Sequence, residues 1–379
     1  MDLLLSWLSH WQGALAVVLV LGGLIFFHEL GHFCVARFFG IGVRVFSLGF
    51  GPRLFGKRYG KTEYRLSLVP LGGYVSLVGE NSSEPEDAEV LAEDARNGVT
   101  FTDEESFFYH PAWQRLLVVL AGPVANFLLA LVIYCGVGLF AGQSFLLPEI
   151  GKVQPDSPAE AAGVRAGDKI VSIDGKNITD WAEVAASIEA GQGRPLTIVF
   201  ERDEGKEIVL FTREVKPEAK SRPNVFGEQK PAWLIGISAS GRYGTKELGL
   251  LGALQAGTRQ TWHMIAFTLE SFKKLFERVV PLDQVGGPIM IAQVVGQQAE
   301  YGVVGVLLIG ALISVNLGIL NLLPVPVLDG GTIVFFLYEI IMRRPVTEKI
   351  RGVATKIGMG LLLALMLLAT WNDIIRILV

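Results

Sequence analysis

Two histidines and a glutamate in the segment FFHELGHF have the spacing of a metal site. His28 and His32 are four residues apart, so a helix places both imidazoles on one face, where they can bind the same zinc ion. Glu29 lies between them and could take a proton from a metal-bound water. The spacing therefore predicts the chemistry of a metal-dependent hydrolase.

The residues around this motif are apolar enough to cross a bilayer. The chain is 51% hydrophobic and 18% charged, whereas soluble proteins carry about 25% charged residues. An ionisable group in hydrocarbon costs about 3 kcal/mol or more, so His28, Glu29 and His32 are expected to serve a function there. The net charge of −4 gives no general attraction for nucleic acid, which is not an expected partner.

Four segments are long and apolar enough to be transmembrane helices, since about twenty residues cross the hydrocarbon layer. They are residues 13–38, 116–140, 303–323 and roughly 357–378. Lys and Arg residues gather after the first segment and between the third and fourth, which places both connections in the cytoplasm. The metal motif then lies towards the cytoplasmic side, and the insert from about 142 to 300 is extracytoplasmic.

A third metal ligand is expected from another span, because catalytic zinc usually has three protein ligands and one open position. The run NLGILNLLPVPVLDGG starts as an apolar helix and then meets Pro324 and Pro326, which cannot donate backbone hydrogen bonds and force the helix to open. Opened backbone at membrane depth is tolerated where it lines a polar cavity. Asp329 follows this break and is the best candidate, although it could also cap a helix that starts at Gly330.

Two further regions have strand patterns. Residues 43–80 alternate apolar and polar side chains with a turn signal at Gly60-Lys61, which predicts a β-hairpin beside the membrane. Residues 149–211 combine short strands with helical patterns near 157–162 and 181–190. Within them, SPAEAAGVRAGDKIVSIDG resembles a PDZ domain, a fold that receives an extended peptide beside a sheet edge.

Several motifs together resemble the site-2 protease family of intramembrane zinc metalloproteases, within it the bacterial type that acts on regulators of sigma-E. They are HELGH, AGPVAN at 121–126, NLLPVPVLDG at 321–330 and GGPIMIAQ at 286–293. The resemblance implies that His28, His32 and Asp329 bind Zn²⁺ and that Glu29 is the catalytic general base. It also implies that Asn321 contacts substrate, although a helix-packing amide is an equally good interpretation of Asn321.

The same resemblance extends to substrate handling. It implies that the hairpin contacts the substrate and that the strand LIGI at 234–237 supplies the peptide-binding loop of a permuted PDZ domain, with Gly236 and Ile237 as substrate-binding residues. The chain departs from its family pattern in one respect. Family members of the sigma-E type carry two tandem PDZ domains, and this sequence shows one.

The predicted architecture is a polytopic α-helical membrane protein with four transmembrane helices, a membrane-associated β-hairpin and one inserted extracytoplasmic PDZ-like α+β domain. Its expected segments are the first span (1–42), the cytoplasmic-side hairpin and loop (43–112), the second span (113–141), the PDZ-like domain (142–240), an amphipathic surface helix and connection (241–300), the third span (301–342), and a cytoplasmic loop with the fourth span (343–379).

The predicted function is hydrolysis of peptide bonds in or near transmembrane segments. The resemblance implies single-span membrane proteins as substrates, such as a pre-cleaved anti-sigma factor or a signal-peptide remnant, and a location in the bacterial inner membrane, in contact with the lipid bilayer. The oligomeric state is not encoded in any pattern. Two alternatives are a proteolytically inactive PDZ-bearing scaffold and a metal or proton transporter. Neither explains a glutamate at the position of Glu29.

Overall fold

The computed structural model describes residues 2–80, 92, 94–96, 98–205 and 207–378. They form two compact units, and each unit is described by itself. Unit 1 consists of Met1–Val137, Leu254–Phe272 and Pro281–Val379. Unit 2 consists of Gly138–Ala253 and Lys273–Val280. Unit 1 carries the metal motif, and unit 2 carries the PDZ-like sequence.

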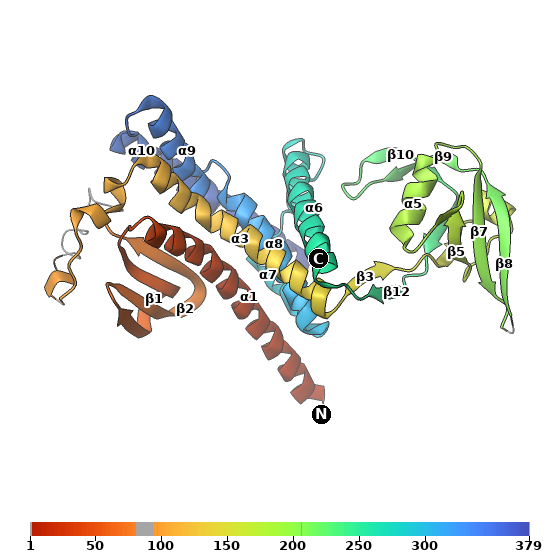
Figure 1. The fold of residues 1–379 in the computed structure, drawn as a ribbon, viewed down its shortest axis with the longest axis horizontal. Helices are drawn as coiled ribbons and strands as arrows, with labels where there is room; N and C mark the ends of the chain where they lie inside the picture. Colours follow the sequence, from red (N-terminus) through yellow and green to blue (C-terminus); the bar gives the residue numbers. More distant parts are fainter. Residues whose placement is uncertain (1, 81–91, 93, 97, 206, 379) are drawn as a thin grey trace. The chain divides into compact units, whose positions relative to one another are not determined.

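Unit 1 is built mainly from long helices (Figure 1). Their bounds are α1 (Asp2–Phe38), α3 (Ala112–Phe140), α7 (Pro288–Glu300), α8 (Gly302–Asn321), α9 (Asp329–Met342) and α10 (Glu348–Leu378). Within the described ranges, four stretches are long and apolar enough to cross a membrane: Gly13–Phe38, Ala112–Phe140, Gly302–Asn321 and Glu348–Leu378. The number of spans agrees with the prediction, and the fourth helix starts nine residues earlier than the expected 357, at Glu348.

Small residues let α1, α3 and α8 approach closely. A Cβ atom built on Gly31 of α1 would lie 2.3 Å from the carbonyl oxygen of Ala121 in α3. One built on Gly318 of α8 would lie 2.9 Å from the Phe127 ring of α3. Helices in lipid associate through such close backbone packing, because lipid tails provide no hydrophobic driving force between helices. The three helices therefore have a fixed mutual position from which side chains can meet.

The third predicted span is interrupted where the prolines predicted a break. Helix α8 ends at Asn321 and α9 begins at Asp329. The connection folds back tightly, since a Cβ atom on Gly330 would lie 2.2 Å from the Leu323 carbonyl oxygen and one on Gly331 would lie 2.4 Å from Cα of Pro326. Asp329 is thus the first residue of a helix, and its carboxylate sits where the backbone has reversed.

The hairpin β1 (Val43–Tyr59) and β2 (Thr62–Leu77) turns at residues 60–61, as predicted (Figure 1). Both strands bend, so that Val45 faces Ser76 on one side and Glu63 on the other. Residues 45–48 therefore have strand partners on both sides, while residues 73–77 pair only with the beginning of β1 in the described part of the chain. The hairpin is thus a small sheet, and residues 73–77 form one of its edges.

A buried carboxylate holds the outer part of this sheet together. Glu63 is 5% exposed, and its carboxylate accepts hydrogen bonds from Arg53 and, at 2.7 Å, from Arg65. Arg58 lies 3.8 Å away. The hydrogen bond from Arg65 holds the pKa of Glu63 below its usual value, and Arg53 adds to this effect. Lys61 ties the hairpin tip to Glu105 at 2.6 Å.

Helix α6 (Leu250–Phe276) was expected to lie along the membrane surface because its pattern is amphipathic. The structure shows instead that part of its apolar face is covered by protein. Met264, Ile265 and Phe272 pack against a buried cluster from α3 and α8. Thr268 also donates a 2.8 Å hydrogen bond to the side chain of Asn316 in α8. Packing on α3 and α8 thus explains part of the amphipathic pattern, while Leu254, Trp262 and Leu269 stay exposed.

The C-terminal helix α10 is attached to the start of α7 by a buried carboxylate. Asp373 is 2% exposed and accepts hydrogen bonds from the backbone N–H groups of Gly287, Ile289 and Met290 at 2.9–3.1 Å. Its neighbour Asn372 donates to the carbonyls of Leu282 and Val285. Helix N-termini have unpaired N–H groups and a positive partial charge, which a carboxylate satisfies.

Unit 2 is an α+β domain. Its strands are β3 (Gln143–Leu146), β4 (Ile150–Val153), β5 (Lys169–Ile173), β6 (Lys176–Asn177), β7 (Leu196–Asp203), β8 (Ile208–Val215), β9 (Glu218–Pro223), β10 (Gln229–Leu234), β11 (Ile237–Ala239) and β12 (Tyr243–Lys246). The helices are α4 (Pro158–Ala161) and α5 (Trp181–Ala190). Strands β6, β5, β7 and β8 form one antiparallel sheet, while β4 pairs with β11 and β9 with β10.

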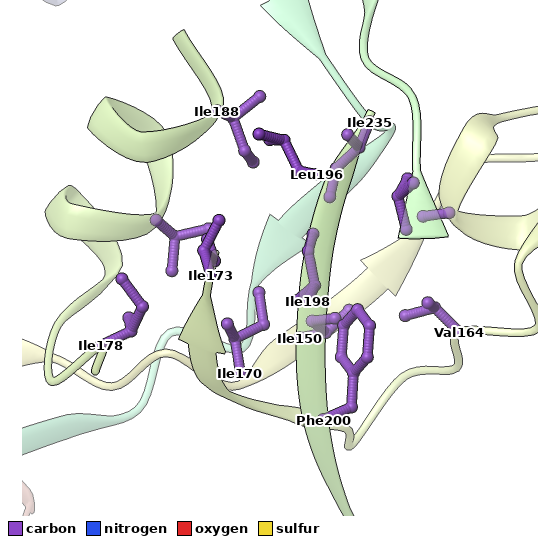
Figure 2. Packing of buried hydrophobic residues seen from close by; sticks show 13 residues of the cluster. Ile150, Val164, Ile170, Ile173, Ile178, Ile188, Leu196, Ile198, Phe200 and Ile235 are labelled. Atoms are coloured by element: carbon purple, nitrogen blue, oxygen red, sulfur yellow. The ribbon is translucent and has the colours of Figure 1, made fainter. Parts of the chain in front are cut away.

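The core of unit 2 consists mainly of aliphatic side chains from the sheet and both helices, together with Phe200 (Figure 2). Ile170, Ile198 and Phe200 are fully buried. The two predicted helices and the strands near 170 and 196 are present. The hairpin of β9 and β10 was not predicted, because its polar, exposed sequence has no apolar alternation.

Candidate metal centre

One helical turn in α1 brings two imidazoles together, and α9 adds a carboxylate. His28 Nε2 and His32 Nε2 lie 3.2 Å apart. Asp329 Oδ2 is 3.0 Å from His28 Nε2 and 3.7 Å from His32 Nε2. One donor atom from each residue lies within 4.8 Å of the other two. Residues about three hundred positions apart in the sequence thus converge on one point, as the sequence predicted.

The backbone of α3 orients His32. Its Nδ1–H donates a 2.8 Å hydrogen bond to the Val118 carbonyl oxygen. This leaves the lone pair on Nε2, the atom that faces Asp329. A metal-binding histidine usually donates its other ring N–H in this way, which fixes both the tautomer and the ring orientation.

Asn126 of α3 plays the matching part for His28. Its side-chain nitrogen lies 3.1 Å from His28 Nδ1, and its Oδ1 atom is buried with no hydrogen-bond partner. The two ends of an amide have nearly the same shape. Turning the amide by half a rotation gives Oδ1 the Nδ1–H of His28 as its donor. His28 Nε2 then carries the lone pair towards the other two ligands.

The donor set fits a catalytic zinc ion. Asp329 Oδ2 is a buried atom that no hydrogen bond reaches, and two imidazole nitrogens and one carboxylate oxygen are a ligand set of catalytic zinc. Gly122 leaves space for both imidazole rings, because it has no side chain. A Cβ atom on Gly122 of α3 would lie 2.4 Å from His32 Nε2 and 2.8 Å from His28 Cε1.

Comparison with known proteins gives the same result over nearly the whole length. The model of peptidase family M50 matches residues 16–365. This chain belongs to peptidase family M50. The resemblance to site-2 proteases seen in its motifs is thereby confirmed.

Several M50 relatives match the chain from end to end. A protein of Rhizobium meliloti, provisionally named a zinc metalloprotease, is 39% identical over 382 residues and covers 99% of both chains. The zinc metalloprotease RasP of Geobacillus kaustophilus is 34% identical, covering 96% of this chain and 98% of its own. The family and these relatives show that this multi-pass membrane protein is an intramembrane zinc metalloprotease, and none of them favours a scaffold or a transporter.

A solved structure of another protein also matches part of this chain. The PDZ domain of an SdrC-like protein from Listeria monocytogenes shares 24% identity, with a TM-score of 0.18, and covers 24% of this chain and 84% of its own.

Glu29 faces the M50 metal centre from the side of the small sheet. It lines a cavity of about 210 Å³ together with His28, His32 and Asp329. The edge of the sheet lies against it, since a Cβ atom on Gly73 of β2 would be 3.5 Å from Glu29 Cγ. The place where a water would be activated is therefore directly beside the open edge of residues 73–77.

The remaining predicted residues fall in two places. Asn321, at the end of α8, has its side-chain nitrogen 3.4 Å from His28 Nε2, so it belongs to the metal centre. Gly236 and Ile237 lie in unit 2, where both line a groove beside α5. Gly236 has a φ of +84°, and a Cβ atom there would lie 2.2 Å from Ser157 Cβ, so this loop requires a glycine.

Sequence reasoning missed several members of the site. Asn126 and Gly122 were visible only as letters of the AGPVAN motif, and the Val118 carbonyl has no side-chain signal. Thr332, Glu80 and Arg351 also line the cavity. They come from α9, from the turn after β2 and from α10, and no local spacing connects them to HExxH.

Proposed function

We propose that this protein hydrolyses peptide bonds in or near transmembrane segments, with His28, His32 and Asp329 as zinc ligands. The observation that carries the proposal is the meeting of Asp329 Oδ2 with both imidazoles, 3.0 and 3.7 Å away. When bound, zinc supplies an activated water and polarises a carbonyl group. Glu29 accepts the proton of the attacking water and delivers it to the nitrogen of the leaving amine.

Asn321 has a positioning role for the substrate in this proposal. Its amide nitrogen is 3.4 Å from His28 Nε2 and can donate to the carbonyl oxygen on which negative charge develops. Preorganised donors of this kind contribute about 3 kcal/mol to transition-state stabilisation in other hydrolases.

The substrate backbone is proposed to pair with residues 73–77 of β2. A transmembrane helix must unwind before its peptide bond can reach a metal, because every helical carbonyl and N–H is already bonded within the helix. Apart from the Val75 N–H, which bonds the Glu29 carboxylate, the edge of 73–77 offers N–H and C=O groups to such an extended segment. Gly73 sits against Glu29, so a segment paired there would pass the general base.

The orientation follows the positive-inside rule. Lys and Arg residues follow the first span and fill the connection between α9 and α10, which favours a cytoplasmic position for both. We therefore propose that the metal centre lies towards the cytoplasm of a bacterial inner membrane and that unit 2 is extracytoplasmic. Single-span proteins already shortened outside, such as anti-sigma factors, and signal-peptide remnants are the proposed substrates.

The groove of unit 2 is proposed to hold an extended peptide at Gly236 and Ile237. The carbonyl oxygens of Ile235 and Gly236 accept the N–H groups of Ala159 and Gln154. These bonds fix the loop in the conformation that the positive φ of Gly236 requires. A rigid loop at the end of a groove is suited to bind a peptide backbone.

The test is Glu29→Gln in the purified protein. The variant should keep one zinc per chain, measured by atomic absorption, and should lose cleavage of a single-span model substrate in proteoliposomes. Cys34→Ala is the matched control, since Cys34 is exposed on the same helix and both properties should survive. Cleavage by Glu29→Gln at the wild-type rate would refute the assigned role of Glu29.

A further inference from the structure

Two cations face each other across the hairpin of β9 and β10. Arg222 is the direct cross-strand partner of Lys230, so their side chains leave the same face of the hairpin. Like charges in this arrangement destabilise a strand pair. Within the described chain neither side chain makes an ion pair. The hairpin therefore carries two uncompensated positive charges side by side.

The carboxylates around this pair are engaged elsewhere. Glu218 pairs with Lys220 at 3.1 Å. Glu228 accepts hydrogen bonds from Lys274 and Asn224 at 2.9 Å each, and the bond from Lys274 makes the largest contribution to lowering its pKa, to which the Lys230 charge adds a smaller part.

A third carboxylate, that of Glu189, accepts the backbone N–H of Trp233 at 3.1 Å. None of these three groups neutralises Arg222.

Both cations open onto the groove of unit 2. The groove has a volume of about 600 Å³ and is lined on one side by α5 and on the other by the hairpin and the loop that follows it. Apolar side chains, including Trp181, Ile188 and Trp233, form much of its wall. A groove that is apolar along its length and cationic at one wall suits an amphipathic peptide with an acidic group.

We propose that Arg222 and Lys230 form a carboxylate-binding site that makes the unit 2 groove selective for acidic peptide segments. The inference rests on the proposed peptide binding at Gly236 and Ile237 and adds the chemistry of the ligand. The carboxylate is either the free C-terminus of a shortened membrane protein or an Asp or Glu side chain. A bidentate Arg contact supported by a Lys is a strong site for either source.

The experiment measures peptide affinity by fluorescence anisotropy on the full chain, carrying Glu29→Gln to prevent cleavage, in phosphatidylcholine nanodiscs. The probe is a labelled decapeptide that ends in valine and contains one Glu. It is compared with the same peptide carrying Gln for Glu, with its C-terminal amide, and with both changes. The peptide that loses affinity identifies the source of the carboxylate.

Arg222→Gln with Lys230→Gln should weaken the acidic peptide about tenfold or more, in line with the value of charge-assisted hydrogen bonds, and leave the neutral amidated peptide unchanged. Lys220→Gln is the matched control, because Lys220 is on the same hairpin face and already paired with Glu218. It should change neither affinity. Reversing both charges, with Arg222→Glu and Lys230→Glu, should create a preference for a peptide with Lys in place of Glu.

Four results would overturn the proposal. Equal losses for acidic and neutral peptides would mean that the pair only supports the groove. Unchanged selectivity in the double variant would mean that the cations do not contact ligand. An effect of the double variant seen only when the nanodiscs contain phosphatidylglycerol would assign the pair to lipid headgroups. Absence of binding by every peptide would instead reject the groove as a peptide site, while zinc binding and proteolysis remain separate measurements.

Discussion

The side-chain amide of Asn126 lies 3.1 Å from Nδ1 of His28, while the other ring nitrogen, Nε2, lies beside His32 and Asp329. Asn126 is completely buried, and its backbone carbonyl accepts the hydroxyl of Ser314. Three helices thus meet at one asparagine. It orients the ring of His28, a proposed zinc ligand, and connects α3 to α8 at the same time.

Replacing Asn126 with leucine should lower zinc affinity about 10- to 100-fold, as expected when a residue that orients a metal ligand is lost. Asn126→Asp should retain more affinity, because a carboxylate can accept the Nδ1–H. Chelator competition on the purified protein measures both. Ser314→Ala is the control in the same helix contact and should keep zinc. Equal zinc affinity in wild type and Asn126→Leu would show that the amide does not orient His28.

Gly122→Ala should abolish zinc binding without unfolding the protein. The new methyl group would lie 2.4 Å from His32 Nε2 and would displace the imidazole from the ligand position. Gly136→Ala in the same helix is the matched control, since a Cβ atom there meets nothing within 4 Å and alanine favours a helix. Zinc content and thermal unfolding of both variants test this expectation. A folded Gly122→Ala protein that still binds zinc would show that the methyl group does not displace His32.

Asp373→Asn should loosen the attachment of α10 to α7. The charge that stabilises three N–H groups of the α7 N-terminus would be lost, and each charge-assisted hydrogen bond is worth about 1.5–3 kcal/mol. We expect faster proteolysis of the segment before α7 and a lower unfolding midpoint in detergent. Arg376→Gln, which removes exposed contacts to the Asp283 carbonyl and the Met290 sulfur but leaves the three N–H bonds of Asp373 in place, should have a smaller effect. Equal protease resistance of wild type and Asp373→Asn would show that the attachment does not depend on charge.

Acid should weaken the small sheet through Glu63. Because the folded pKa of Glu63 lies below its ordinary value of 4.5, the ion pairs contribute fully to stability above pH 4.5 and their contribution is lost as the pH falls through the folded pKa. Glu63→Gln should therefore lower the unfolding midpoint at pH 7 by a few degrees and flatten its fall as the pH drops below 4.5. An unchanged pH profile would exclude Glu63 as the titrating group.

The convergence of His28, His32 and Asp329 could be predicted because their signals are local and strong. His28 and His32 share a helical face because of their spacing. The two prolines before Asp329 indicate the opened backbone that brings a carboxylate to membrane depth. The four spans were equally readable from apolar length. Their ends were less so, because the polar residues at the start of α10 continue the helix beyond the apolar stretch.

The residues that support these ligands could not be predicted. Asn126 acts because it lies beside His28. Gly122 acts because it has no side chain at the point where two imidazole rings lie against α3. Both relationships depend on how α1 packs on α3. The double pairing of β1 was not predicted either, because the alternation of apolar and polar residues indicates a strand but not where the strand bends. Helix α6 shows the converse, because an amphipathic pattern is the same for a helix on lipid and a helix on protein.

The open edge at residues 73–77 has a consequence for where substrates are cut. In an antiparallel pair the hydrogen-bonding pattern and the direction of side chains repeat every two residues. A substrate strand bound to this edge can shift by two residues and meet the same groups, whereas a shift of one residue turns its side chains to the opposite face. Secondary cleavage products should therefore differ from the main product by two residues. The register of the bound strand would then determine the cleavage position as much as the substrate sequence does.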